Sequence, residues 1–412
     1  MADVTIVSPV EAQRNQVALN SGPIWTSDLI GYFFYTRTGG EQIFFKKTLD
    51  GGETFGSEVT VTSMNGIGFG LWYDRWTSGD NGTLIHIADM DGAGQTAYRA
   101  LDTSDDTLTT FVSVVDLAHA SDIGSAWIIK HVGITKARGG NLYISTAGSN
   151  VLVPFDEAFM RSTDGGATWT QRAALLETTA QSLLDFAILM PGNEADNQDI
   201  WVAYLDRSAT ELSLKVYDDS ANSFSETSIA TGMILSTSGQ LLHLGATTRH
   251  SDDHMLVAAM SEIGVATGDM RMWDINGSGS IVEKANVLTN ESHWGAHISI
   301  NQQNDDIRVG YFGDGVETFA TGKVYFKLST DGGTSWGAET LFNESAVALV
   351  RTMHGDISIG NGGGRYELAW FVPGGGDLML TNFVNSIAFA GGASPVAISA
   401  QVGMQQRNLL LL

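Results

Sequence analysis

The chain has 412 residues, with 22 Lys or Arg against 46 Asp or Glu, so its formal net charge is −24 at pH 7. This charge argues against a nucleic-acid partner held by a broad basic surface, because the phosphate backbone would be repelled. The sequence contains no Cys, which excludes disulfides, thiolate metal ligands and cysteine nucleophiles.

The N-terminal sequence predicts neither a signal peptide nor membrane insertion. Residues 1–5, Met-Ala-Asp-Val-Thr, contain no basic stretch followed by an apolar run. No apolar run in the chain approaches the length of a membrane span. We therefore expect a protein that is cytoplasmic at synthesis and leaves the cell, if at all, by another route such as lysis.

Short segments rich in β-branched and aromatic residues follow one another along the whole chain. One set is 30–36, 83–88, 141–145, 200–205, 254–260, 307–312 and 367–372. A second set follows it at 42–47, 97–101, 157–162, 212–217, 270–273 and 324–328, each ending before a turn rich in Gly, Asn or Asp. Further apolar stretches precede and follow these pairs. The pattern predicts an all-β protein with about four strands per repeat.

A nine-residue pattern recurs almost unchanged at 47–55, 161–169 and 328–336. Its common form is Ser or Thr, any residue, Asp-Gly-Gly, any residue, Thr or Ser, and an aromatic residue. It resembles the Asp-box, or BNR repeat, of sialidase-like β-propellers. In such a turn the Asp can accept hydrogen bonds from backbone N–H groups, and the glycines supply positive φ. The resemblance implies a structural role for Asp50, Asp164 and Asp331 and for the aromatic residues Phe55, Trp169 and Trp336.

Weaker copies of the turn fill the gaps between these three. The anchor residues are then Asp50, Asp102, Asp164, Asp218, Asp274, Asp331 and Asn382, spaced 51 to 62 residues apart. This period is typical of propeller blades. We predict a single domain over residues 1–412, a seven-bladed β-propeller of four-stranded antiparallel blades. Six blades plus a terminal extension is the alternative, and the segments 4–10 and 396–402 are the expected partners in ring closure.

The resemblance to sialidases does not extend to their catalytic residues. That family binds the substrate carboxylate with three arginines, and the motif carrying the first is absent, since residues 21–25 read Ser-Gly-Pro-Ile-Trp. Arg37 lies where the second is expected, and Arg249, Arg308, Arg351 and Arg365 are not identified by any motif. We therefore expect no sialidase activity, although two suitably spaced carboxylates would suffice for another glycosidase.

Histidines recur at one position of the expected innermost strands. His131, His243, His297 and His354, with Asp185 in the same column, are spaced 54 to 58 residues apart. They predict either a polar ring at the channel mouth, able to bind a metal or to change charge, or a repeated structural contact with the adjacent blade. Repetition in register favours the structural interpretation.

Tryptophans near the ends of the same strands are Trp25, Trp72, Trp76, Trp127 and Trp294, and of these Trp72, Trp127 and Trp294 are the candidates for stacking on sugar rings. The alternative is burial between blades. No cofactor is predicted, although the acidic segments 89–91 and 252–253 offer oxygen ligands for Ca²⁺.

The function that we expect is a non-catalytic scaffold or recognition module, a structural component of a phage particle or a similar assembly, and hence located in a virion. The expected partners are other protein subunits, in a homo-oligomer or virion, or a surface glycan. The apolar tail at 403–412, which ends in four leucines, either packs on the ring or docks on a neighbouring subunit. The alternatives are a sialidase-like or other glycoside hydrolase and a lectin-like glycan-binding propeller.

Overall fold

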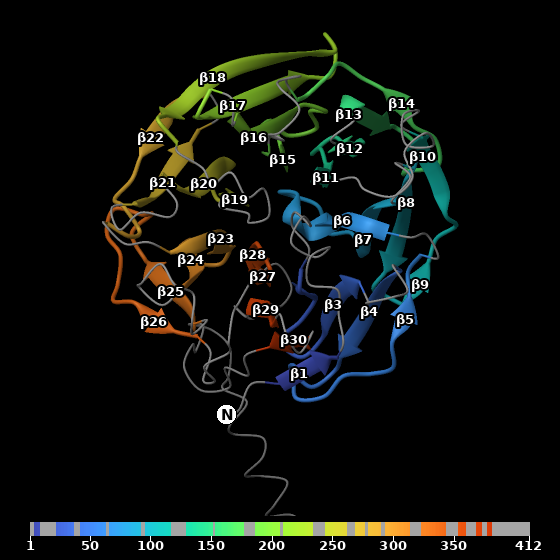
Figure 1. The fold of residues 1–412 in the computed structure, drawn as a ribbon, viewed down its shortest axis with the longest axis horizontal. Coiled ribbons are helices and arrows are strands. Elements are labelled where there is room, and N and C mark those ends of the chain that lie inside the picture. The colour runs from blue at the N-terminus through green and yellow to red at the C-terminus, as the bar shows by residue number, and fades with distance from the viewer. Residues whose placement is uncertain are drawn as a thin grey trace, which may run out of the picture.

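The computed structural model describes residues 4–8, 22–36, 42–62, 66–91, 95–116, 129–150, 153–176, 186–206, 209–233, 244–261, 268–276, 279–289, 293–313, 323–342, 353–359, 368–372 and 377–380. Its strands form separate sheets that radiate from a common centre, as Figure 1 shows. Within each blade the first strand lies innermost and the last lies on the rim. The prediction of an all-β propeller with four-stranded antiparallel blades is confirmed.

Six blades are each built from consecutive strands. Blade 1 contains β2 (Ile24–Trp25), β3 (Gly31–Thr36), β4 (Ile43–Thr48) and β5 (Val59–Thr60). Blade 2 contains β6 (Gly66–Tyr73), β7 (Leu84–Asp91), β8 (Gln95–Asp102) and β10 (Val112–Asp116), with β9 (Thr107–Leu108) beside β8 and the 3₁₀ turn η1 (Asp74–Trp76) after β6. Blade 3 contains β11 (Ile129–Lys136), β12 (Leu142–Asn150), β13 (Val153–Ser162) and β14 (Thr170–Gln171).

The next three blades repeat this plan. Blade 4 contains β15 (Phe186–Pro191), β16 (Ile200–Asp206), β17 (Glu211–Asp218) and β18 (Ser223–Thr231). Blade 5 contains β19 (Leu244–Arg249), β20 (His254–Met260), β21 (Met270–Ile275) and β22 (Ile281–Glu283). Blade 6 contains β23 (Trp294–Asn301), β24 (Asp306–Gly313), β25 (Lys323–Ser329) and β26 (Thr340–Leu341), and β28 (Ser358–Ile359) pairs in parallel with β23.

The remaining sheet joins a strand near the N-terminus to strands that follow blade 6, and we call it the closing sheet. It contains β27 (Met353–Gly355), β29 (Leu368–Val372), β30 (Asp377–Leu380) and, at its outer edge, β1 (Val4–Val7). Val4 pairs with Leu380 and Val7 with Leu378. The prediction of seven blades is therefore wrong, and the structure has the alternative arrangement of six consecutive blades and a terminal piece. The expected closing segment 396–402 lies outside the described residues.

Neighbouring blades approach closely where their innermost strands carry glycine. A Cβ atom on Gly245 would lie 2.5 Å from the carbonyl oxygen of Ala296 in the next blade, and one on Gly70 would lie 2.9 Å from that of Val132. Real side chains do not tolerate such distances. The absence of a side chain therefore allows these inner strands to pack against each other.

Basic side chains connect the blades on their outer part. The Nζ atoms of Lys215 and Lys327 donate to carbonyl oxygens of the preceding blade, to Leu175 at 3.0 Å and Val287 at 2.9 Å. Arg99 donates in the same way to Val61. Lys46 of blade 1 donates to Ile6 of the closing sheet at 2.8 Å. We call these four residues the cation clamps. The Lys46 clamp shows that the closing sheet lies beside blade 1 in the position of a preceding blade.

Candidate functional site

The three Asp-Gly-Gly turns lie between the third and fourth strands of blades 1, 3 and 6. In each, one carboxylate oxygen of the Asp accepts a backbone N–H bond of 2.9 Å from the Thr or Ser four residues later, which is Thr54, Thr168 or Ser335. Both glycines of each turn have positive φ. Hydrogen bonds from Thr168 and Ser335 lower the pKa of Asp164 and Asp331 to about 2. Each of the three carboxylates thus stabilises its own turn through hydrogen bonds.

The aromatic residue of each turn packs inward. The ring of Phe55 lies edge-on to Phe33 of its own blade, with centroids 5.1 Å apart. The ring of Trp169 lies 5.3 Å from that of Tyr98 in the preceding blade. Trp336 donates from Nε1 to the carbonyl oxygen of Ala285, also in the preceding blade, at 2.9 Å. Two of the three turns therefore join neighbouring blades.

One end of the ring carries these turns and also the connections between first and second strands, because the strands alternate in direction. We call this end the turn face. Here η1 of blade 2 places Trp76, which is 1% exposed, against residues from distant parts of the chain. Trp76 Nε1 donates to Asp356 Oδ1 at 2.8 Å, and the Trp76 carbonyl oxygen lies 3.2 Å from His250 Nε2 of blade 5. The contact was not predicted, since nothing in the sequence near Trp76 indicates a partner in blade 5 or after blade 6.

Asp356 follows β27 and is only 2% exposed. Besides Trp76, it accepts bonds from the backbone N–H groups of Trp25 in blade 1 at 2.9 Å and of Ser358 at 3.1 Å. Burial raises the pKa of Asp356 to about 7, although these hydrogen bonds act in the opposite direction. A single carboxylate thus links the segment that follows β27 to blades 1 and 2.

A second buried network surrounds Asp74, the first residue of η1. Its Oδ1 atom lies 2.9 Å from His86 Nε2 and accepts a 2.6 Å bond from Lys136 Nζ of blade 3. His86 Nδ1 in turn lies 2.8 Å from the hydroxyl oxygen of Tyr98. Burial opposes ionisation of Asp74, but the hydrogen bonds and charges of His86 and Lys136 outweigh it and lower its pKa to about 2. The network joins blade 2 to blade 3 and leaves its histidine 2% exposed.

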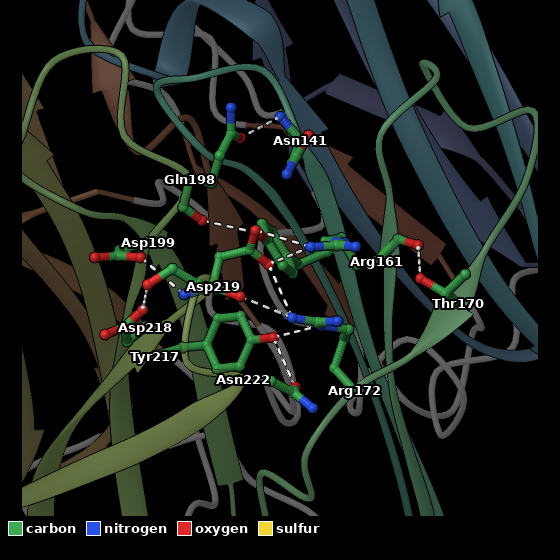
Figure 2. Close-up of polar contacts among 12 residues, drawn as sticks. Asn141, Arg161, Thr170, Arg172, Gln198, Asp199, Tyr217, Asp218, Asp219 and Asn222 are labelled. Atoms are coloured by element: carbon green, nitrogen blue, oxygen red, sulfur yellow. Dashed lines mark hydrogen bonds and ion pairs between the residues drawn. The ribbon is translucent and has the colours of Figure 1, made fainter.

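A third network, drawn in Figure 2, joins blades 3 and 4. Arg161 Nη1 donates to both carboxylate oxygens of Asp219 at 2.8 Å. Arg172 donates from Nη2 to the carbonyl oxygen of Asp219 at 2.8 Å and from Nε to the hydroxyl oxygen of Tyr217 at 2.6 Å. Asp199 fixes the same loop by accepting the Asp219 N–H bond at 2.8 Å. These arginines fasten two blades and are occupied by that contact.

The histidine column is described at one side chain only. His297 lies on β23, and its ring nitrogens are inaccessible to solvent. Burial lowers its pKa to about 4, against a smaller opposing effect of the Gly355 backbone in the closing sheet. The backbones of His131 and His354 lie on β11 and β27, and nothing is described of their side chains. Asp185 and His243 lie outside the described residues.

The proposed stacking role of Trp72 is wrong. Trp72 is fully buried, and its Nε1 donates to Thr77 Oγ1 at 3.0 Å. Its ring packs edge-on to that of Trp76, 5.5 Å away, so the apolar faces that a sugar would need are covered. Trp294 begins β23, without a described side chain, and Trp127 lies outside the described residues.

Neither arginine whose side chain is described remains available for a sialidase-like cluster. Arg249 donates to Asp252 at 2.6 Å and to Asp274 at 3.1 Å, and Arg308 is 2% exposed. Arg37, Arg351 and Arg365 lie outside the described residues. Among the residues that are described, no three His, Asp or Glu side chains form a group that could hold a metal ion. Asp89 is buried rather than presented to a cation.

Comparisons with known proteins identify the fold. No family model matches the chain, and no curated protein matches it. The structure is similar to an ulvan lyase of polysaccharide lyase family PL25, with a TM-score of 0.59 and 12% identity, covering 92% of this chain and 94% of that one. A structure of such a lyase bound to -[GlcA(1-4)Rha3S]- gives a TM-score of 0.57 at 12% identity and the same coverage.

A sialidase from Trypanosoma rangeli is more distant, with a TM-score of 0.43 and 9% identity over 82% of this chain and 58% of that one. In the described part of the chain, no helix is long and apolar enough to cross a membrane. At 12% identity, the similarity to the ulvan lyases establishes a β-propeller fold and no more.

Proposed function

We propose that the chain is a non-catalytic β-propeller recognition module, a rigid ring that serves as a component of a phage particle or a similar assembly. The observation that supports this proposal is the use of charged side chains. Asp74, Lys136, Arg161, Arg172 and Asp219 form contacts between blades. In an enzyme such charged side chains would contact the substrate, whereas here they hold neighbouring blades together. We propose also that the three Asp-Gly-Gly turns are Asp-boxes.

The second candidate is a polysaccharide-active or polysaccharide-binding propeller. It is favoured by the structural similarity to the ulvan lyases over nearly the whole chain. One of those structures is bound to -[GlcA(1-4)Rha3S]-, a unit of glucuronate and sulfated rhamnose. A chain with a net charge of −24 would repel such a polyanion unless a local basic surface opposed the field. We therefore expect an uncharged glycan to bind better than a charged one.

The two proposals are separated by assaying binding and cleavage independently. The purified chain is incubated with ulvan and with neutral polysaccharides, and cleavage is followed by new reducing ends and by the ultraviolet absorbance of unsaturated uronate. Binding is measured on an immobilised glycan array at low and high salt. The recognition proposal predicts no cleavage. Turnover of any of these polysaccharides would overturn it in favour of the enzyme.

The assembly role is tested on particles. Mass spectrometry and antibody labelling of purified phage particles from the encoding host should detect the chain in stoichiometric amount. Its absence from the particles would remove the virion component of the proposal, while leaving glycan recognition intact.

A further inference from the structure

The turn face of blade 1 carries two exposed leucines. Leu29, just before β3, is 50% exposed, and Leu49, just after β4, is 65% exposed. The N–H group of Gly51 donates to the carbonyl oxygen of Leu29 at 2.9 Å, so the two turns that carry these leucines lie together. The other two Asp-Gly-Gly turns have the exposed residues Thr163 and Thr330 in the place of Leu49. We call Leu29 and Leu49 the leucine pair.

The end of the described chain lies in the adjoining sheet and on the same face. β27 runs toward the turn face, because Asp356 follows it and bonds Trp76 there. β29 is antiparallel to β27, and β30 is antiparallel to β29, so β30 also ends at the turn face, with Leu380. Figure 1 shows β30 beside β1 and next to blade 1. Phe55 of the first Asp-Gly-Gly turn packs against the apolar cluster that β1 and blade 1 form together.

The sequence that follows Leu380 is suited to this surface. Residues 381–412 contain no Asp or Glu, their one charge is Arg407, and they end in four leucines at 409–412. The leucine pair is flanked in sequence by Asp28 and Asp50, so the approaching segment and the surface differ in the sign of their charge. Neighbouring sheets lie about 10 Å apart, and an extended chain gains about 3.3 Å per residue. Residues 381–408 are therefore long enough to bring the leucines to blade 1.

We propose that residues 409–412 dock on the leucine pair of the same chain and so strap the closing sheet to blade 1. A contact with two leucines is far smaller than the roughly 1,200 Å² that a stable interface between separate proteins buries. A segment tethered to the same molecule has an effective concentration in the millimolar range, so a small contact suffices for it. Size therefore favours this chain's own segment over a separate partner. The inference does not depend on the proposed function of the ring.

Trypsin measures the docking in the full-length protein. Arg407 is the only Lys or Arg after Arg365, so its cleavage releases the leucines and is followed by intact mass spectrometry. Leu49→Thr introduces the residue of the other two turns. It should accelerate cleavage at Arg407 about 3- to 10-fold, because cleavage follows the undocked population. Val282→Thr, at a 49% exposed position on β22, is the matched control and should leave the rate unchanged.

A disulfide locates the contact. The chain contains no Cys, so two introduced cysteines can pair only with each other. Leu49→Cys combined with Leu410→Cys should form an intramolecular disulfide on mild oxidation. Thr163→Cys combined with Leu410→Cys places the first cysteine at the same position of the turn in blade 3. We expect the Leu49 pair to form its disulfide at least about tenfold faster than the Thr163 pair.

Three results would overturn the proposal. One is cleavage at Arg407 that Leu49→Thr does not accelerate, which would mean that the leucine pair does not hold the segment. Another is equal disulfide formation with blades 1 and 3, which would show that the segment has no preferred site. The third is a disulfide-linked dimer, or protection of Arg407 that is lost on dilution, which would assign the contact to a second copy. Circular dichroism of each variant verifies that the ring is folded.

Discussion

Asp356 is the position where a single substitution should most clearly reveal how the ring is held closed. Its carboxylate accepts hydrogen bonds from Trp76 Nε1 and from the Trp25 N–H group, at 2.8 and 2.9 Å. In Asp356→Asn, one of these donors must face the new amide NH₂ group, which cannot accept. Leaving a buried donor unpaired costs about 1–3 kcal/mol, so at pH 5 the variant should be less stable than the wild type by about this amount.

The difference should depend on pH, and its sign follows from the raised pKa. An aspartate with a pKa of about 7 in the fold, against about 3.9 when unfolded, is protonated more readily in the folded state. Its contribution to stability is therefore largest below about pH 4 and is lost as pH rises through about 7. The full loss is about 4 kcal/mol at 1.36 kcal/mol per pKa unit. Asparagine does not titrate, so the wild type should lose its advantage, or fall below the variant, at pH 8.

Urea unfolding followed by tryptophan fluorescence at pH 5 and pH 8 measures this change. Other titrating groups, such as Asp89 with its pKa raised to about 8 by burial, are present in both proteins and cancel in the difference. A wild-type-to-variant difference that is the same at both pH values would refute the assigned titration. Equal stability of the wild type and Asp356→Asn at pH 5 would refute the stabilising role of the hydrogen bonds that Asp356 accepts.

The remaining predictions concern the packing of blades. Lys215→Met removes a cation clamp whose side chain is 5% exposed, and it should lower the free energy of unfolding by about 1–3 kcal/mol. Lys47→Met, in an exposed ion pair, should lower it by less than about 1 kcal/mol. Similar effects of the two substitutions would show that the clamp contributes no more than a surface contact. Gly245→Ala forces a Cβ atom to within 2.5 Å of the next blade and should cost about 2–4 kcal/mol by the same urea assay, whereas Gly232→Ala, with open space around a positive φ, should cost only about 1 kcal/mol. Burial lowers the pKa of His297, so its neutral ring stabilises the fold fully above pH 6.5 and this stabilisation is lost as pH falls toward 4. The free energy of unfolding of His297→Gln should therefore fall less with acid than that of the wild type. An unchanged acid midpoint would contradict this.

Local patterns in the sequence predicted the strands well. The segment 200–205 was expected as a strand and is β16, Ile200–Asp206, while 254–260 is β20, His254–Met260. Both are short apolar runs bounded by turn residues, and such runs determine strand position without reference to the rest of the chain. The Asp-Gly-Gly turns were located for the same reason, because an Asp that bonds its own turn and glycines with positive φ act within nine residues.

Contacts between distant segments were not predictable in this way. The bond from Trp76 to Asp356 joins residues separated by 280 positions, and its geometry exists only once the ring has closed. The cation clamps had a visible signal, since Lys46, Arg99, Lys215 and Lys327 all lie three or four residues before an anchor of the repeat. Their partners are backbone carbonyl groups, which every residue offers, so the sequence gives the donors and not the acceptors. Strand-end aromatics are compatible with stacking and with burial, and Trp72 is buried, which is the alternative given for it.

Closure also determines how substitutions should combine. Opening the ring at the closing sheet would break the β1–β30 pairing, the Lys46 clamp to Ile6 and the bonds of Asp356 to blades 1 and 2 in one event. If one substitution opens the closing sheet, the other contacts of that sheet are already lost. A second substitution there then lowers the free energy of unfolding by less than it would alone. Clamps inside the consecutive blades, such as Lys215, are lost only when their own pair of blades separates. Substitutions at Lys46 and Asp356 should therefore be coupled to each other, while Lys215 and Asp356 should be additive.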